Sequence, residues 1–308
     1  MAFTAASFFR LIRYPNLLMS ALAIWGHWHF LIARPLSMIH QPTLMNFWII
    51  LGVGLSFALV MGGGFVINDI FDEKIDRINK GDRQILGNSI SLKWAWKLYW
   101  ILNTLAMLAT YVIAYQLELL KYVFLLPLSV ILLYFYSSRL KKTAFLGNLC
   151  IAILCGFVLW IPFLGESSGL NVIQKNTVSA QFFYCSVVAF FLTLTRELIK
   201  DIQDIDGDKA GGARTVPIIW STKKTFRLVI TLIIITIISL LTGIFYFDFN
   251  WIGILLITVS LLGPLLIMLY KLLGECSHSY MGRYSTLVKI LMAVGMILLP
   301  MCLSIFRR

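Results

Sequence analysis

The sequence of residues 68–83 is NDIFDEKIDRINKGDR, with aspartates at positions 69, 72 and 76. A second stretch, KDIQDIDGDKAGGARTVPI from Lys200 onward, repeats this spacing with Asp201, Asp204 and Asp208. In a helix, positions i, i+3 and i+7 fall within an arc of roughly 60°. Each stretch is therefore predicted to point three carboxylates in one direction wherever it is helical.

These two stretches hold most of the acidic residues in the chain. Of its 14 Asp and Glu residues, ten lie within residues 69–82 and 197–208. Because neighbouring carboxylates repel each other unless cations intervene, this concentration predicts a cation site. Carboxylate oxygens suit Mg²⁺ or Ca²⁺, and no His or Cys accompanies them, as zinc would prefer. The simpler alternative is two solvated helix ends, with the aspartates paired to interleaved bases: Lys74, Arg77, Lys80 or Lys209.

The rest of the chain is strongly apolar. Its 308 residues are 59% hydrophobic and only 13% charged, whereas an ordinary soluble domain is about 25% charged. Apolar runs of about 17–22 residues recur, which is the length that a membrane-spanning helix needs. The sequence therefore predicts an all-α, polytopic membrane protein with a single domain over residues 1–308. Nine spans are expected, near residues 14–33, 47–67, 94–116, 122–138, 144–164, 181–198, 226–247, 250–270 and 285–306.

The basic residues predict the orientation of these spans. With the N-terminus on the cytoplasmic side, that side receives all but five of the 26 Lys and Arg residues. Such an asymmetry is what the positive-inside rule requires. Both Asp-rich stretches are then loops on the cytoplasmic face of an integral membrane protein, in the plasma membrane if the cell is prokaryotic. The five basic residues left on the other side are Arg34, Lys121, Lys175, Arg307 and Arg308.

Two further features bear on possible partners. The net charge of +12 does not indicate a nucleic-acid partner, because the basic residues are scattered between apolar spans and form no single patch. Nothing in the sequence indicates an obligate protein partner. His27 and His29 lie in the first span, where a histidine is a functional candidate, although near a span end it can simply contact interfacial water.

The residue types favour a diphosphate as the ligand at this membrane surface. Mg²⁺ binds a few carboxylates and completes its coordination with water and substrate phosphates, while Lys and Arg bind the remaining phosphate oxygens. A lipid with a diphosphate head would place its tail among the helices. If that tail is allylic, departure of the diphosphate leaves a carbocation that aromatic ring faces can stabilise. Packing against lipid or core is the alternative for the aromatic residues in question, which are Tyr134, Tyr136, Phe157 and Trp160.

The two acidic motifs resemble those of a known family. NDIFDEKID, from Asn68, is similar to the first N-D-x-x-D-x-x-x-D signature of the UbiA superfamily of intramembrane prenyltransferases, and DIQDIDGD, from Asp201, to its second signature. The expected nine spans, with motifs after spans two and six, also resemble that family. RELIKDIQDIDGDKAGGARTVPI is most similar to the branch that prenylates geranylgeranylglyceryl phosphate, and LIRYPNLLMSALA supports the same branch.

The resemblance assigns roles to individual residues. It implies that two Mg²⁺ ions are held by Asn68, Asp72, Asp76, Asp204 and Asp208, with Asp69 and Asp201 in support. YSSRLKK resembles a segment that lies near the diphosphate, which implicates Tyr136, Lys141 and Lys142. Further residues expected near the head group are Arg83, Lys209 and Arg214, with Asn16 in the pocket. The Gly81-Asp82-Arg83 sequence departs from the family pattern, which has a proline beside the Asp-Arg pair in many members.

The resulting hypothesis is a Mg²⁺-dependent prenyltransferase whose catalytic residues are Asp72, Asp76, Asp204, Asp208, Tyr136 and Lys141. It would transfer a polyprenyl group, expected to be geranylgeranyl, from its diphosphate to the hydroxyl of geranylgeranylglyceryl phosphate. One alternative is an aromatic prenyltransferase of quinone biosynthesis that uses 4-hydroxybenzoate or dihydroxynaphthoate. A membrane cation transporter is another, but transporters place ionisable groups near the bilayer midplane. A scaffold without catalytic activity would not need so many focused acids.

Overall fold

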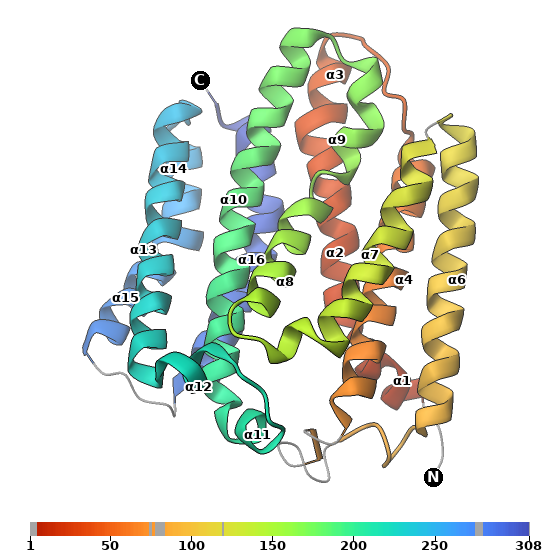
Figure 1. Ribbon diagram of the computed structural model, residues 1–308. Coiled ribbons are helices and arrows are strands. Elements are labelled where there is room, and N and C mark those ends of the chain that lie inside the picture. The colour runs from red at the N-terminus through yellow and green to blue at the C-terminus, as the bar shows by residue number, and fades with distance from the viewer. Residues whose placement is uncertain (1–4, 74–75, 78–83, 119, 275–279, 308) are drawn as a thin grey trace. The chain divides into compact units, whose positions relative to one another are not determined.

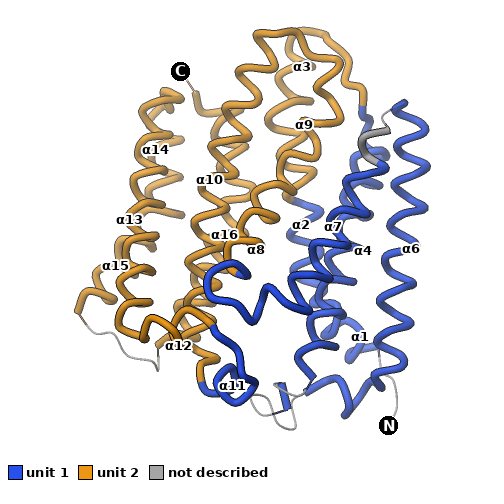
Figure 2. The backbone as a smooth tube through the Cα atoms, in the orientation of Figure 1, with its two compact units in different colours: residues 1–22, 45–147, 206–214 blue, residues 23–44, 148–205, 215–308 orange. Residues whose placement is uncertain are grey.

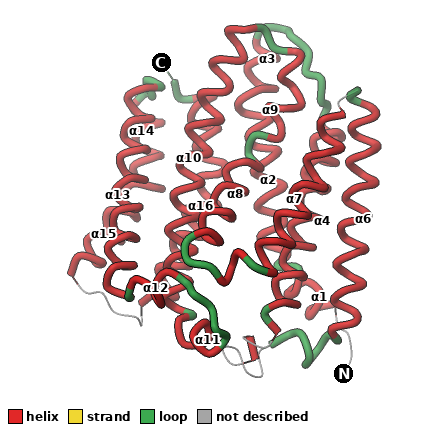
Figure 3. The backbone as a smooth tube through the Cα atoms, viewed as in Figure 1, coloured by secondary structure: helices red, strands yellow, loops and turns green. Residues whose placement is uncertain are grey.

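The computed structural model describes residues 5–73, 76–77, 84–118, 120–274 and 280–307. These residues form helices joined by turns, and none of them belongs to a β-sheet (Figure 3). The predicted all-α class is therefore confirmed for the part of the chain that is described. Arg83 lies outside it.

Four helices begin directly after a residue whose side chain caps the helix start. Asn46, Ser91, Asn171 and Asn250 each accept a hydrogen bond from a backbone N–H in the first turn of the helix that follows. Such a cap satisfies one of the backbone donors that a helix start leaves without a partner. The four helices are α4 (Phe47–Phe71), α6 (Leu92–Gln116), α10 (Val172–Gln203) and α14 (Trp251–Ile257), in the same order as their caps.

The contacts divide the chain into two compact units, coloured separately in Figure 2. Unit 1 comprises residues 1–22, 45–147 and 206–214, and unit 2 comprises the remainder. Unit 1 contains α1 (Ala5–Leu11), the first part of α2 (Tyr14–Trp28), α4, α6, α7 (Leu120–Ser138), the 3₁₀ turn η3 (Leu140–Lys142) and most of α11 (Ile205–Ala210).

Unit 2 is built around α10. This helix packs against α13 and α16, as Figure 1 shows. Two π-helical segments, η1 and η5, interrupt the helices of this unit. Besides α10 and α14, its elements are the end of α2, η1 (His29–Ala33), α3 (Arg34–Met38), α8 (Leu146–Val158), α9 (Ile161–Glu166), η4 (Ser167–Gly169), α12 (Val216–Trp220), α13 (Thr222–Tyr246), η5 (Thr258–Leu262), α15 (Gly263–Gly274) and α16 (Met281–Ile305).

The predicted count of nine membrane spans is only partly reproduced. The described residues contain seven helices that are long and apolar enough to cross a membrane, or eight if the pair α8 and α9, bent by 45°, forms one span. The remaining predicted span, residues 14–33, is helical throughout but divided between α2 and η1. Its α-helical part, α2, is only 15 residues long, and the π-helical segment η1 follows it directly.

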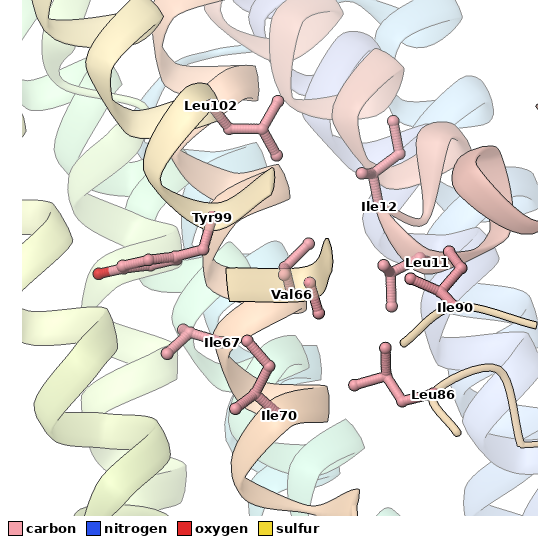
Figure 4. Packing of buried hydrophobic residues seen from close by; sticks show 10 residues of the cluster. Leu11, Ile12, Val66, Ile67, Ile70, Leu86, Ile90, Tyr99 and Leu102 are labelled. Atoms are coloured by element: carbon pink, nitrogen blue, oxygen red, sulfur yellow. The ribbon is translucent and has the colours of Figure 1, made fainter. Parts of the chain in front are cut away.

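The core of unit 1 joins its N-terminal helix to α4 and α6. Leu11 and Ile12 belong to one buried cluster with Val66 and Ile70 of α4 and Tyr99 of α6, and Figure 4 shows Leu11 facing Val66. Burying an apolar side chain of this size stabilises the fold by about 1.5–3 kcal/mol. The end of α4, where the first acidic stretch begins, is thus packed against neighbouring elements.

A buried carboxylate in unit 2 links several of its elements by hydrogen bonds. Glu166 is 1% exposed. One of its oxygens accepts a hydrogen bond from Trp28 Nε1 at 3.0 Å, and the other accepts one from the backbone N–H of Leu44 at 2.8 Å. Hydrogen bonds to a charged acceptor are among the stronger ones in proteins. They tie α9 to α2 and to the connection that follows α3.

Close helix packing in unit 2 predicts a specific sensitivity at Gly243. A Cβ atom at this position of α13 would lie 2.2 Å from the ring of the buried Tyr184 on α10. We expect Gly243→Ala to destabilise the protein by about 1–3 kcal/mol, because the Tyr184 ring has to move within a packed core. Gly274→Ala is the matched control, since among the described residues no atom beyond its chain neighbours and its own helix backbone lies within 4 Å of a Cβ there. Thermal unfolding of the purified variants checks this, and equal melting temperatures for the two would contradict it.

Candidate diphosphate and metal site

The first acidic motif lies where α4 ends. The helix stops at Phe71, and Asp72 occupies the C-cap position with φ −90° and ψ 1°. The Asn68 amide, one turn earlier, donates to Asp72 Oδ2 at 3.0 Å. Asn68 and Asp72 are four residues apart, so their side chains meet on one face. The motif therefore presents an amide and a carboxylate together.

Lys141 completes this group. Its ammonium contacts Asp72 Oδ2, and the Asp72 side chain is only 6% exposed while that of Lys141 is 34% exposed. A carboxylate this buried needs a compensating charge. The sequence resemblance implied that Lys141 contacts the diphosphate and that Asp72 ligates the metal. In the structure Lys141 contacts Asp72.

The segment that carries Lys141 is itself held in place. Lys141 and Lys142 form the turn η3, and the Lys142 carbonyl accepts a hydrogen bond from the backbone N–H of Arg214 at 2.9 Å. Residues 206–214 belong to the same compact unit as η3. Part of the second acidic stretch thus contacts the basic turn beside the first. The side chains of Lys142, Lys209 and Arg214 are exposed.

Neither acidic stretch is a single continuous helix. In the first, α4 ends before Asp72; in the second, α10 ends at Gln203, with Asp204 as its C-cap, and Asp208 lies on the separate helix α11. The periodicity that predicted three aligned carboxylates therefore breaks within each stretch. Among the residues that the structure describes, no three or more Asp, Glu, His or Cys side chains form a group that could hold a metal.

Asp69 and Asp201 have protein partners of their own. Arg13 donates to Asp69 Oδ1 at 2.9 Å in unit 1, and Asn148 donates to Asp201 Oδ2 at 2.8 Å in unit 2. Nothing in the acidic motifs themselves predicted Arg13, which the sequence suggested only as a charge that sets topology. Asn148 follows the YSSRLKK segment closely, and that proximity indicates from the sequence that it lies in the same region.

The residues at Asp72 fit a magnesium ion that is shared with a substrate. Mg²⁺ is usually bound by one or two carboxylates together with water and substrate phosphate, so a preformed group of three acids is not required. The donors present, the Asp72 carboxylate and the Asn68 side chain, are hard ligands of the type that Mg²⁺ prefers. A cationic ammonium already contacts this carboxylate, which indicates that the position attracts positive charge.

Other residues expected at the site also belong to unit 1. Tyr136 and Asn16 belong to unit 1 and are partly buried, as are Asp76 and Asp208. The Asn16 side-chain oxygen is buried without a hydrogen-bond partner among the described residues. Tyr134 is 39% exposed, and its ring packs edge-on against Phe71, with centroids 5.6 Å apart.

His27 and His29 both belong to unit 2. His27 is fully buried in unit 2, with Nδ1 donating to the Ala23 carbonyl at 2.8 Å, and it lines a small apolar cavity between α10 and α16. His29 stacks on Trp25, with ring centroids 5.0 Å apart. These contacts are those of interior packing.

Comparison with known proteins defines the family. The UbiA prenyltransferase family matches residues 28–284. The chain is 34% identical over 254 residues to a digeranylgeranylglyceryl phosphate synthase from Methanosphaera stadtmanae, an alignment that covers 82% of this chain and 86% of the relative. It is 30% identical over 276 residues to the synthase of that name from Sulfurisphaera tokodaii, which covers 87% and 94%, respectively.

Solved structures agree with this relationship. One from a study of digeranylgeranylglyceryl phosphate synthase in membranes has a TM-score of 0.64 at 25% identity, with 97% of both chains covered. A UbiA homologue from Archaeoglobus fulgidus bound to DMAPP and Mg²⁺ has a TM-score of 0.62 at 18% identity, with 95% of this chain and 99% of that chain covered.

The apolar helices and these matches define an integral membrane prenyltransferase. Its acidic motifs begin in the last turns of α4 and α10. The chain belongs to the UbiA prenyltransferase family.

The packing beneath Lys141 generates a prediction. A Cβ atom on Gly147 would lie 2.8 Å from the Leu140 carbonyl oxygen and 3.0 Å from the Lys141 Cα. Both are backbone atoms, so Gly147→Ala must displace the turn that carries Lys141. We expect the KM for the prenyl donor to rise about tenfold, the size of one lost charged contact.

Gly156→Ala on the same helix is the control for this variant. Its nearest neighbour is the Ser186 carbonyl oxygen at 3.4 Å, so an added methyl group fits. Steady-state kinetics of both variants would check the expectation. An unchanged KM in Gly147→Ala would show that the Lys141 turn does not need this close packing.

Proposed function

We propose that the protein transfers a geranylgeranyl group from geranylgeranyl diphosphate to the hydroxyl of geranylgeranylglyceryl phosphate, with Mg²⁺ as cofactor. The relatives named for this synthase activity align with more than four fifths of the chain, which supports the choice of substrates. The observation that carries the chemistry is the buried Asp72 carboxylate, whose Oδ2 is contacted by both the Asn68 amide and the Lys141 ammonium.

The proposed metal ligands are Asn68, Asp72, Asp76, Asp204 and Asp208, which together would hold two ions. Bound Mg²⁺ would neutralise charge on the diphosphate and make it a better leaving group. Asp69 and Asp201, whose oxygens are engaged by Arg13 and Asn148, would support the ligands from behind. Residues that lie behind the ligands of a metal site commonly fix the orientation of those ligands.

Lys141 has two roles in this proposal. Without substrate, its ammonium compensates the charge of Asp72. When the metal and diphosphate bind, Asp72 ligates the metal and Lys141 is free to turn to the phosphate oxygens, so one lysine serves both states. Lys142, Lys209 and Arg214 are exposed basic residues of the same unit and would contact the outer phosphate oxygens, as Arg83 would.

The proposed reaction exchanges one C–O bond for another. The acceptor hydroxyl oxygen bonds to C1 of the prenyl group, and the bond from C1 to the diphosphate oxygen breaks with its electron pair on the diphosphate. The hydroxyl proton is released, so the products are a diether, diphosphate and one proton. Positive charge on the allylic carbons would be stabilised by aromatic ring faces, for which the candidates are Tyr134, Tyr136, Phe157 and Trp160.

The orientation is proposed from charge. The acidic motifs and their basic neighbours would face the cytoplasm, because the interspan segments on that side hold most of the Lys and Arg residues. In a prokaryotic cell the membrane would be the plasma membrane, and the substrates would reach the site from its cytoplasmic leaflet.

The substrate assignment predicts one product among several possible products. Purified protein in nanodiscs, given geranylgeranyl diphosphate, Mg²⁺ and an equimolar mixture of geranylgeranylglyceryl phosphate, 4-hydroxybenzoate and 1,4-dihydroxy-2-naphthoate, is expected to form only the diether. Mass spectrometry of the lipid extract would identify it. Chelation of Mg²⁺ should abolish the product, because the leaving group would then keep its full charge.

The outcomes of this assay separate the alternatives. A prenylated aromatic product would keep the prenyl transfer and reject the proposed acceptor, making the protein an enzyme of quinone biosynthesis. No product from any acceptor, together with transport of labelled cations into liposomes, would reject the proposed reaction. For variants that remove a proposed acidic ligand, Asp206→Asn is the control, because Asp206 is exposed and lies outside the proposed ligand set.

A further inference from the structure

Arg13 lies in the turn between α1 and α2. Its φ is 53°, in the left-handed region that residues other than glycine seldom adopt. Its N–H donates to the Arg10 carbonyl at 3.2 Å, and its own carbonyl accepts from the Asn16 N–H at 2.8 Å. These bonds fix the turn from which the Arg13 side chain reaches α4.

The guanidinium of Arg13 makes two contacts with α4. Nη2 donates to Asp69 Oδ1 at 2.9 Å, and the guanidinium carbon lies 4.7 Å from the centre of the Phe65 ring. Phe65 and Asp69 are four residues apart and so share one face of the helix. A guanidinium can satisfy a carboxylate and an aromatic face at once, whereas a lysine ammonium provides no planar surface for stacking. Arg13 therefore binds the last two turns of α4 along one face.

Apolar packing holds the same elements together. Leu11 and Ile12, immediately before Arg13, pack with Val66 and Ile70 of α4 (Figure 4). The ion pair thus lies next in sequence to members of a buried cluster, and its carboxylate is largely buried. The Asp69 side chain is 11% exposed, and that of Arg13 is 35% exposed. Removing the arginine would take one positively charged partner away from a largely buried carboxylate.

Arg13 contacts α4 on a side that is turned away from Asn68 and adjacent to that of Asp72. Asn68 and Asp72 are one helical turn apart and hydrogen-bonded to each other. Asp69 is one residue beyond Asn68 and three before Asp72, so its side chain is rotated by about 100° from the first and about 60° from the second around the helix. One side of the helix end is therefore anchored to the α1–α2 turn, and the adjacent side presents Asn68 and Asp72 to Lys141.

We propose that Arg13 and Asp69 form a positioning pair that sets the direction of Asn68 and Asp72, and that Asp69 does not ligate metal. This proposal rests on the proposed function, because it assigns the metal to Asp72. Arg13 also limits electrostatic repulsion, since Asp69 and Asp72 are two poorly solvated carboxylates within a single turn.

The proposal is tested by metal binding and kinetics together. Mn²⁺ binding in the presence of geranylgeranyl diphosphate would be followed by electron paramagnetic resonance for Arg13→Gln, Asp69→Asn, Asp72→Asn and the exchanged double variant Arg13→Asp/Asp69→Arg. We expect Arg13→Gln and Asp69→Asn to keep the wild-type number of bound ions with affinity lowered about tenfold, as for loss of an outer partner of a metal ligand. Asp72→Asn should lose an ion.

Rescue distinguishes positioning from ligation. The exchanged double variant should recover binding to within about threefold of wild type, because it restores the charge pair with opposite polarity. Arg13→Lys should fall between wild type and Arg13→Gln, because it keeps the charge but not the planar contact with Phe65. Arg10→Gln, which removes an exposed arginine from α1, is the charge-matched control and should behave as wild type.

Two results would overturn the proposal. Loss of an ion in a folded Asp69→Asn protein, without recovery in the exchanged variant, would make Asp69 a ligand. Wild-type kinetics and binding in Arg13→Lys and Arg13→Gln would show that the pair positions nothing. Failure of the proposed function would appear differently, as a wild-type protein that binds no Mn²⁺ with the diphosphate, and would remove the positioning role as well.

Discussion

A single buried charge governs the site of this prenyltransferase. Asp72 lies at the end of an apolar helix with its side chain almost fully buried. An ionised carboxylate in such surroundings is stable only if it is paired and hydrogen-bonded. Lys141 and Asn68 provide that compensation. Three features of unit 1 support these side chains. They are the backbone bond between Arg214 and Lys142, the Arg13–Asp69 pair, and the close approach of Gly147 to the Lys141 turn.

The need to compensate Asp72 explains features far apart in the sequence. Lys141 can reach the carboxylate because its turn lies tightly against Gly147 and accepts a hydrogen bond from Arg214. Residues 206–214 thus connect the second acidic stretch with the first through the backbone of the basic turn. Charge compensation of this kind also suits the chemistry, since a carboxylate that can exchange an ammonium for a metal ion changes partners without becoming uncompensated.

Much of this arrangement could be predicted from the sequence, because hydropathy and acidic spacing are local signals. The helical class, most of the spans and the positions of the acidic motifs after α4 and α10 follow from them. The points at which helices end could not, because Asp72 and Asp204 take C-cap conformations that a regular spacing does not reveal. The Arg13–Asp69 pair joins residues 56 positions apart, and helical periodicity carries no information about such contacts.

The most direct test of the account is calorimetric titration of geranylgeranyl diphosphate into the wild-type protein and Asp72→Asn, with and without Mg²⁺. The account predicts tight binding only to the wild type with Mg²⁺, and a loss of at least about 100-fold in the variant, because a direct ligand matters more than its outer partners. Equal binding by wild type with and without Mg²⁺, or by Asp72→Asn and wild type, would contradict the claim that Asp72 holds the metal and diphosphate.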